Sequence, residues 1–379
     1  MKRAGVHEIA RIAKVSIGTV DRALHGRPRI SKATRDKVLK VAEKLGYTPH
    51  LAARALAVGR SQFRVGVCIP EEIRFFYDQM RDGIFEEARR AARVGMEVIY
   101  KPVPRLGEGE QRQISRLLKE ELRALVVMPG NPHVVVPLID AAEARGIRVV
   151  CIGSDAPDSR RSTVVYANPD LQGRLAAELL SKFIPRKSDV AVITGMLQTQ
   201  EHRQKVEGFK VRFAECSMAG VNVQVLEAHE SEVESYRKTR ELLNQRPNLR
   251  GIYVTTVNCL PVCRAVHEAG RDDVRLITTD LFPQMVPFFE SGIIGASIYQ
   301  DPYTLGQSAV RLLVDHLVDK VPIRDANYLN PGIVLRSNLG LFREIRMPQT
   351  ERAETVPTAS VITSSLGESS RQRAASTNA

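Results

Sequence analysis

Two short segments near the start of the chain, separated by a tight turn, constrain its architecture more than any other feature. Residues 7–14 carry an apolar face at helical spacing, formed by Ile9, Ala10, Ile12 and Ala13. Ser16 can cap a second helix over residues 16–24, whose inward positions are Val20, Ala23 and Leu24. A third helix over residues 31–45 would close this core through Ala33, Val38, Val41, Ala42 and Leu45. Together these segments predict a small helix-turn-helix domain.

Spacing alone leaves another hypothesis open, in which these segments are amphipathic helices of a larger helical domain. Charge favours the first hypothesis, because residues 1–60 hold 14 Lys or Arg and only 4 Asp or Glu, while the whole chain carries a net +12. Such a local excess is typical of polyanion binding. The outward positions of the second helix, which would then face a major groove, are Ile17, Gly18, Asp21 and Arg22.

Three stretches carry a family resemblance, namely VHEIARIAKVSIGTVDRAL, RISKATRDKVLKVAEKLGYTPH and LAARALAVGR. They resemble the DNA-binding head of the lactose-repressor (LacI/GalR) family, without a break from residue 6 to residue 60. The resemblance implies a recognition helix over residues 16–24 and a hinge helix over residues 50–58. It also implies that Leu56 wedges between base pairs in the minor groove, although a linker leucine packed on the next domain is the alternative.

The resemblance implies phosphate contacts by Thr19, His25, Arg29, Ser31 and Thr34. Asp21 stands where the family usually has Ser, and a carboxylate beside phosphate is repelled unless it pairs with a cation or accepts from a cytosine amine. Arg22 is left as the candidate for a bidentate guanine contact, since Gly18 has no side chain and Ile17 can touch only methyl groups. The full expected DNA-binding set is Ser16, Ile17, Gly18, Thr19, Arg22, His25, Arg29, Ser31, Thr34 and Leu56.

Strand and helix patterns alternate after residue 63. Strands are expected at residues 65–69, 96–100, 125–128 and 147–152, and a second series at 190–193, 221–226, 251–254, 276–278 and 295–298. This alternation predicts the α/β class, with two doubly wound parallel lobes beside the small all-α head. Such lobes bind ligands at the carboxyl ends of their strands.

Aromatic and polar residues follow the predicted strand ends, and they suit a polyhydroxylated ligand. The same stretches, from about residue 64 to 342, resemble periplasmic sugar-binding proteins of the ribose-binding type. That resemblance implies effector contacts by Phe75, Phe76, Asp155, Arg203, Asn258, Asp280 and Gln300. Each has a plainer alternative: Asp280 as a helix cap, Arg203 as a surface ion-pair partner, the Phe pair as core. Because Glu72, Arg74 and His202 add ionisable groups, three effector classes stay open, namely a neutral sugar, a sugar acid and a sugar phosphate.

The sequence lacks the motifs that are typical of several enzyme classes. The chain has no GxSxG, GxxxxGK[ST] or HExxH pattern and no GxGxxG after the first strand, so we expect neither an enzyme nor a cofactor. The rival hypotheses are a sugar-processing enzyme using Asp155 and Asp280 as an acid/base pair, and an architectural DNA-bending protein. Five Cys, an odd number, indicate reduced core thiols; Cys259 and Cys263 have helical spacing for a shared metal, but no zinc set is complete.

The expected domains are a helix-turn-helix head over residues 1–48, a hinge and linker over 49–62, a two-lobed effector and dimerisation domain over 63–345, and a disordered tail over 346–379. We find no signal-peptide pattern and no apolar run long enough to span a membrane, so a cytoplasmic protein is expected. The tail lacks a leucine heptad, which favours a homodimer. The sequence thus predicts a repressor, or alternatively an activator, that binds palindromic double-stranded DNA under control of a sugar-like effector.

Overall fold

The head of the chain is a three-helix unit. The computed structural model describes residues 6–24, 30–45, 62–216 and 223–340. Its first helices are α1 (Val6–Ala13), α2 (Ile17–Leu24) and α3 (Lys32–Lys44). They share a core formed by Ile9, Ala10, Ala13, Val20, Ala23, Val38 and Ala42. The helix-turn-helix prediction is confirmed, but two expected core positions are wrong, because Ile12 is 41% exposed and Ala33 is also exposed.

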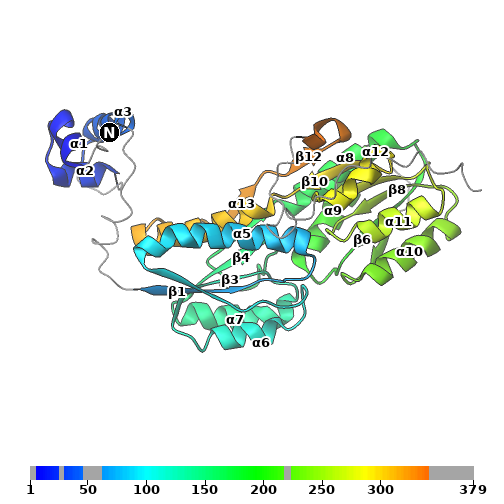
Figure 1. The fold of residues 1–379 in the computed structure, drawn as a ribbon, viewed down its shortest axis with the longest axis horizontal. Coiled ribbons are helices and arrows are strands. Elements are labelled where there is room, and N and C mark those ends of the chain that lie inside the picture. The colour runs from blue at the N-terminus through cyan, green and yellow to red at the C-terminus, as the bar shows by residue number, and fades with distance from the viewer. Residues whose placement is uncertain (1–5, 25–29, 46–61, 217–222, 341–379) are drawn as a thin grey trace, which may run out of the picture.

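The first lobe, here the N-lobe, is built on a parallel six-stranded sheet in the order β11-β5-β4-β3-β1-β2. Its strands are β1 (Phe63–Cys68), β2 (Met96–Tyr100), β3 (Leu122–Val127), β4 (Arg148–Ile152), β5 (Thr163–Ala167) and β11 (Ala326–Leu329). Two helices, α5 (Arg74–Ala91) and α13 (Pro302–Asp319), lie side by side on one face (Figure 1). The other face carries α6 (Glu110–Leu117) and α7 (Pro132–Ala144), and the one-turn η1 (Ala92–Val94) leads into β2.

The second lobe, here the C-lobe, repeats this plan with the order β12-β10-β9-β8-β6-β7. Its strands are β6 (Asp189–Thr194), β7 (Val223–Glu227), β8 (Leu249–Val254), β9 (Arg275–Thr279), β10 (Ile294–Tyr299) and the antiparallel β12 (Gly332–Val334). One face packs on α8 (Pro169–Phe183) and α9 (Gln200–Glu215). The other face packs on α10 (Glu232–Gln245), α11 (Leu260–Glu268), η2 (Pro283–Met285) and α12 (Val286–Glu290), and η3 (Arg336–Asn338) follows β12.

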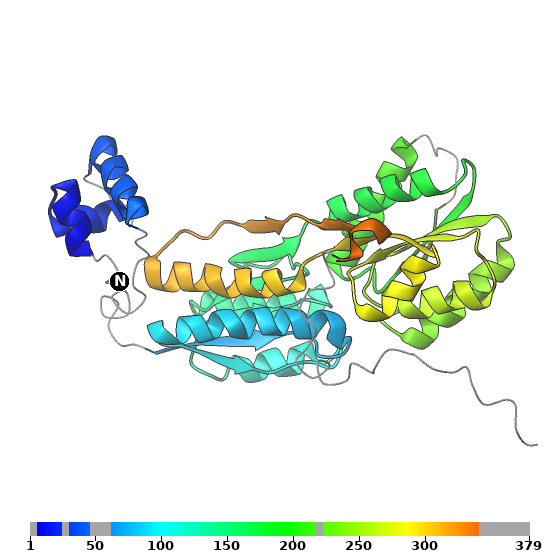
Figure 2. The ribbon, with the colours of Figure 1, turned by 45° about the horizontal axis from the view of Figure 1, so that its top comes forward.

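The backbone passes repeatedly from one lobe to the other. Within the described residues, the backbone passes between them three times: after β5, between β10 and α13, and between β11 and β12. Figure 2 shows the last of these passages, where the orange segment runs beside α13 from one lobe to the other. The two-lobed parallel α/β prediction is confirmed, while β5, β11 and β12 were not predicted. Because connections of this kind allow two lobes to rotate about a few backbone positions, they are typical hinges.

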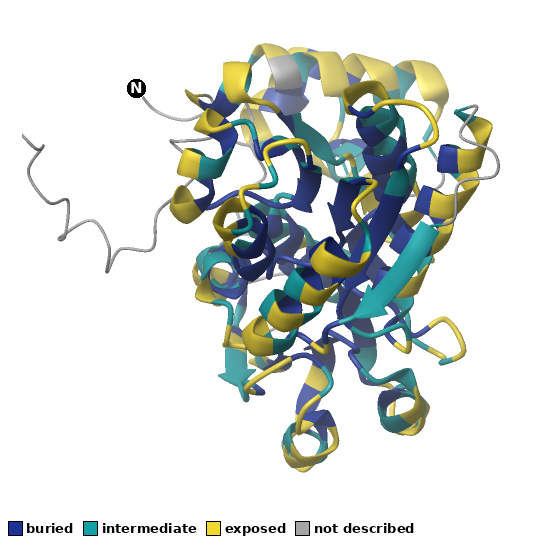
Figure 3. Cartoon of the chain, turned by 90° about the vertical axis from the view of Figure 1, so that its right-hand side faces the viewer, coloured by how far each residue is buried: buried dark blue, intermediate teal, exposed yellow. Residues whose placement is uncertain are grey.

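Burial follows the layered plan. The strands of both sheets are largely buried, and exposed positions gather on the outer faces of the helices (Figure 3). Among the described residues, no helix combines the length and the apolar character needed to cross a membrane. The carboxyl ends of the strands of the two lobes therefore become the place to look for polar groups that the cores do not require.

Candidate functional site

The head presents a polar surface around the start of α2. Ile17 is 47% exposed, and Gly18 and Arg22 are exposed with it, while Asp21 is half-buried. The Thr19 backbone N–H donates to Ser16 Oγ at 3.1 Å. The predicted positions His25, Arg29 and Leu56 lie outside the described residues.

The start of α3 repeats the arrangement found at α2. The backbone N–H of Thr34 donates to Ser31 Oγ at 3.2 Å, and the two hydroxyl oxygens lie 2.7 Å apart. Hydroxyl groups thus stand at the N-termini of both helices, where free backbone N–H groups and the helix dipole favour phosphate.

A cavity of about 350 Å³ opens between the two lobes. The N-lobe contributes Glu72, Ile73, Phe75 and Arg105, and the C-lobe contributes Glu230, Ser231, Glu232, Val233, Val257, Asn258, Leu260 and Phe282. A deeper space of about 20 Å³, room for one water molecule, lies between Phe76 and Tyr77 on one side and His202, Lys205 and Gln300 on the other. Glu230 and Val257 line both spaces, so we treat them as one interlobe site.

Direct contacts hold the lobes together at this site. The ring of Phe75, from α5 of the N-lobe, stacks on Phe282 of the C-lobe with ring centroids 4.8 Å apart and planes 13° apart. The hydroxyl of Thr199, which precedes α9, donates to the carbonyl oxygen of Gly130 in the N-lobe at 2.7 Å. Phe75 therefore contributes to the lobe contact as well as to the cavity wall, whereas Phe76 is buried beside Tyr77.

A chain of buried polar groups lines the C-lobe side. It begins at Asp280, directly after β9, whose carboxylate accepts from the backbone N–H of Gln300 at 2.9 Å and from its Nε2 at 2.7 Å. Gln300 Oε1 in turn lies 3.3 Å from Lys205 Nζ. The pKa of Asp280 rises to about 6, chiefly because burial disfavours its charged form. Asp280 thus orients Gln300, and Gln300 is the residue that reaches the deeper space.

The same chain continues along α9. Lys205 is only 1% exposed, forms an ion pair with Glu201, and donates to the carbonyl oxygen of Thr255 at 3.0 Å. His202 Nδ1 lies 3.1 Å from the backbone nitrogen of Met196 and 3.3 Å from its carbonyl oxygen, so the ring is held by the Met196 backbone. His202 Nε2 lies 3.3 Å from Glu201 Oε2 and 3.5 Å from Glu230 Oε1. The ammonium of Lys205 thus contacts Glu201, and the imidazole of His202 lies between Glu201 and Glu230.

Glu230 stands at the end of this chain in an unusual backbone conformation, with a φ of 54°. Burial, and to a lesser degree repulsion from Glu201, raises its pKa. A Cβ on Gly195, the residue after β6, would lie 2.2 Å from Glu230 Oε1. Glycine is therefore needed there for Glu230 to approach His202. Left-handed backbone outside glycine costs about 1–3 kcal/mol and is found mostly at functional sites.

Two residues of the expected effector set lie elsewhere. Arg203 is exposed on α9 and pairs with Gln200, because the inward face of that helix is taken by its neighbours His202 and Lys205. Asp155 is buried, but both of its carboxylate oxygens bind the guanidinium of Arg161. Among the remaining predicted residues, Phe75, Phe76, Asn258 and Gln300 line the site, and Asp280 supports it.

Sequence reasoning missed Glu201, Lys205, Glu230 and Thr255. One signal was available: Glu201 and Lys205 are four residues apart, so they share one face of α9, and that face also carries the apolar Phe209. Charged residues on the apolar face of a helix must be buried and paired. No comparable pattern marks Glu230, because its position depends on a loop after β7.

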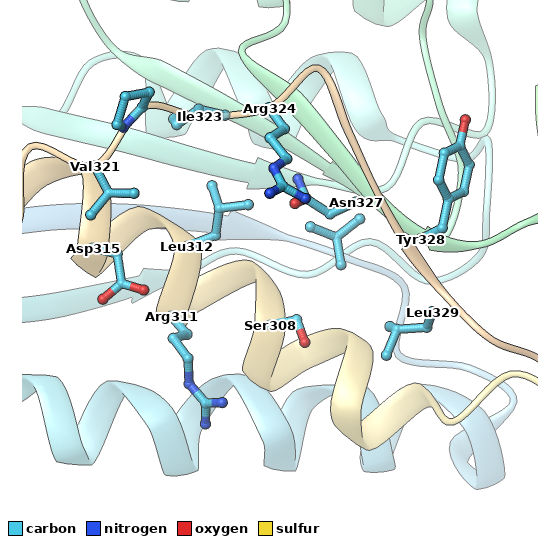
Figure 4. Close-up of a pocket in the computed structure, with 12 residues that line it drawn as sticks. Ser308, Arg311, Leu312, Asp315, Val321, Ile323, Arg324, Asn327, Tyr328 and Leu329 are labelled. Atoms are coloured by element: carbon cyan, nitrogen blue, oxygen red, sulfur yellow. The ribbon is translucent and has the colours of Figure 1, made fainter. Parts of the chain in front are cut away.

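Another hollow, of about 340 Å³, lies wholly within the N-lobe between α13 and β11 (Figure 4). Arg324 and Asn327 lie over α13 there, whereas Arg311 points away from them and donates to Glu87 of α5. All of the residues that line this hollow belong to one lobe. Within the described ranges, no group of three or more His, Cys, Asp or Glu side chains has the arrangement of a metal site. Cys259 and Cys263 are buried at α11.

Comparison with known proteins agrees with this architecture. Residues 65–320 match the family model described as "Periplasmic binding protein domain", and residues 5–50 match "Bacterial regulatory proteins, lacI family". The catabolite control protein A of Priestia megaterium is 25% identical over 331 residues, which cover 82% of this chain and 92% of that protein. The ribose operon repressor of Halalkalibacterium halodurans is 23% identical, covering 86% and 94% of the two chains.

Solved structures show the same two-lobed fold. A solute-binding protein of an ABC transporter from Burkholderia graminis, in complex with D-arabinose, superposes with a TM-score of 0.67 at 21% identity, covering 74% of this chain and 98% of that one. The glucose-galactose binding protein GanP from Geobacillus stearothermophilus gives 0.65 at 23% identity, with 74% and 99% covered. With a helix-turn-helix head joined to a periplasmic binding protein domain, and with both family models matched, this chain belongs to the lacI family of bacterial regulatory proteins.

Proposed function

We propose that the protein is a cytoplasmic, dimeric transcriptional repressor whose affinity for a palindromic operator is set by a small polyhydroxylated effector bound between its two lobes. The observation that carries this proposal is the interlobe site, which takes residues from both lobes. A ligand that touches both lobes binds their closed arrangement better than the open one. It can therefore shift the population of the two arrangements by its difference in affinity.

The chemistry of the interlobe site supports a polyhydroxylated effector. Phe75 and Phe76 offer aromatic surface from the N-lobe, and Asn258, Gln300 and Glu230 offer amide and carboxylate groups from the C-lobe. Rings cover the apolar C–H face of a sugar, while amides and carboxylates bind its hydroxyls. The cavity of about 350 Å³ is at the small end of ligand pockets, which span roughly 300–1,000 Å³.

The named relatives support the regulatory part of the proposal. They are called catabolite control protein A, ribose operon repressor and HTH-type transcriptional repressor PurR. On the head, Arg22 and Ile17 are the exposed side chains of α2 that can reach base edges, while Thr19, Ser31 and Thr34 would hold phosphate. Two heads on an inverted repeat follow from the symmetry of a dimer.

The proposal is tested on DNA selected by the full-length protein from a random pool. Fluorescence anisotropy on the selected duplex should show an inverted repeat that binds more tightly than a single half-site, with log K falling steeply as log salt rises. Arg22→Ala should relax the preference at one base pair in each half-site. The matched control is Arg11→Ala on α1, an arginine of the same domain whose side chain is 75% exposed beside Glu8. A protein that enriches no sequence, or whose affinity ignores salt, contradicts the proposal.

A further inference from the structure

We propose that the effector carries a positively charged amino group together with its hydroxyls, and that Glu230 receives this group. The inference rests on the proposed function, because it assigns a chemical class to the molecule bound in the interlobe site. It follows from two observations: every basic side chain at the site already lies against a carboxylate, and two buried polar atoms of residues that line the cavity have no hydrogen-bond partner.

The cations of the site are all engaged. Arg105 donates from Nε to Glu72 at 2.6 Å, and Arg74 donates to Asp78 at 3.2 Å. Lys205 is paired with Glu201 and also satisfied by two further oxygens. His202 Nε2 lies against the carboxylates of Glu201 and Glu230. A phosphate or carboxylate on the ligand would have to displace one of these pairs, and it would enter beside Glu230 and Glu232.

The buried anions outnumber the buried cations. Glu201, Glu230 and Asp280 are each at most 9% exposed, and within the described part of the interlobe site these three carboxyl groups face two buried basic groups, the ammonium of Lys205 and the imidazole of His202. Lys205 lies against Glu201 and Gln300, so it does not reach Glu230 with a hydrogen bond. The pKa of Glu230 is raised chiefly by burial, while His202 acts in the opposite direction. A ligand cation would supply the missing charge.

Two unpartnered atoms define where the ligand binds. Glu230 Oε1 has no hydrogen-bond donor, since the nearest one, His202 Nε2, lies 3.5 Å away. Asn258 Nδ2 has no acceptor, although Asn258 is only 7% exposed. Both residues line the cavity. An ammonium donates to Glu230 and a hydroxyl oxygen accepts from Asn258, so an amino sugar or an aminated cyclitol meets both requirements. A phosphate or carboxylate group would instead place a second negative charge beside Glu230.

The test uses matched compounds on the full-length protein. D-Glucosamine, D-glucose, N-acetyl-D-glucosamine, D-glucuronate and D-glucose 6-phosphate differ in charge around one ring, and the D-galactose and aminated inositol series repeat the comparison. Thermal shift and calorimetry are expected to rank an amine above its neutral parent by at least ~10-fold in Kd, about 1.4 kcal/mol, with the anions weakest. The inference is overturned if a neutral or anionic member binds as tightly as its amine, or if no amine binds.

Variants identify the group responsible. Glu230→Gln keeps the shape and removes the charge, and is expected to bring the amine to the affinity of its neutral parent while leaving the neutral compound within about threefold. Glu232→Gln is the matched control, because Glu232 lines the same cavity but its side chain is 74% exposed and pairs with Arg264. It should retain the amine preference. The Tm of ligand-free Glu230→Gln should stay equal or rise, since a buried charge is removed. If its Tm falls and the preference for the amine over its neutral parent is retained, Glu230 has a structural role and the inference is overturned.

Operator binding separates a wrong effector class from a wrong mode of regulation. If a neutral or anionic compound binds and changes operator affinity, the regulator remains and only the amine assignment is wrong. If an amine binds with the expected preference but operator affinity never changes, the assignment of the site holds and the proposed regulation is wrong. Operator anisotropy with each binding compound separates these outcomes.

Discussion

Substitution of Gly195 by Ala should damage the interlobe site without touching any residue that contacts DNA. A Cβ at this position would lie 2.2 Å from Glu230 Oε1, 2.5 Å from His202 Cε1 and 2.8 Å from His202 Nδ1. All three distances are shorter than real Cβ contacts. Gly195 is not in the left-handed region, so the clash and not backbone strain determines the effect.

The magnitude follows from what must move. Both neighbours are buried, and His202 is also fixed by the backbone of Met196. Adding one methyl group to a packed site costs about 1–3 kcal/mol. At roughly 2–4 °C per kcal/mol, the Tm should fall by several degrees. Displacement of Glu230 should also weaken the tightest-binding compound of the panel by at least ~10-fold, about 1.4 kcal/mol.

The assay is thermal unfolding with and without that compound, together with operator anisotropy of the ligand-free protein. Gly340→Ala is the matched control, because nothing lies within 4 Å of its added Cβ and its backbone is not left-handed. The control should be neutral or slightly stabilising. Ligand-free operator affinity should stay within about threefold, ~0.7 kcal/mol, for both variants. If Gly195→Ala is as stable as the wild type and binds the compound equally well, the packing of Glu230 on His202 described above is refuted.

Further substitutions test the other parts of the site. Lys205→Met should destabilise the fold by about 3–5 kcal/mol, because it leaves Glu201 charged and buried. Arg203→Ala should change the free energy of unfolding by no more than about 0.5 kcal/mol. Equal effects of the two substitutions in urea titrations would contradict the orientation of α9. Phe75→Ala should weaken effector binding by about 0.5–1.5 kcal/mol through loss of the Phe282 stack, and calorimetry showing no loss would remove that contact from lobe closure. The raised pKa of Asp280, about 6 against an ordinary 3.8, means that its stabilising contribution is full below pH 4 and lost as pH rises through 6. The difference in unfolding free energy between the wild type and Asp280→Asn should therefore fall by at most about 3 kcal/mol as pH rises across that window. A difference that does not change with pH would show that Asp280 titrates normally.

Local patterns predicted the elements well. The helical spacing of Ile9, Ala13 and Val20 was enough to place the three-helix head, and most buried strands were found within a few residues of their ends. β11 and β12 were not predicted because they are short, half-buried strands at the edge of a sheet, whereas β5 was missed although all five of its residues are buried. The three passages of the backbone between the lobes cannot be predicted from local sequence patterns, since they depend on which sheet each strand joins.

The site was harder to predict than the fold. Gln300, directly after β10, and Asn258, in the loop after β8, were expected to lie close together because parallel strands bring their carboxyl ends to one edge, and both line the interlobe site. Arg203 was chosen over Lys205 because the registry of α9 against the sheet cannot be read from a resemblance of a few residues. Asp155 was chosen without its partner Arg161, since the loop that joins them makes a contact that spacing does not reveal.

The account's central claim is that effector and operator are coupled through the arrangement of the two lobes. The most direct measurement is a reciprocal pair of titrations on the full-length protein, with operator Kd determined at zero and saturating effector, and effector Kd determined at zero and saturating operator. Linkage requires the same factor in both directions, and allosteric coupling is typically 5- to 150-fold, about 1–3 kcal/mol. The account predicts two equal factors well above one. Operator affinity that stays unchanged at saturating effector, or two factors that differ beyond error, would contradict it.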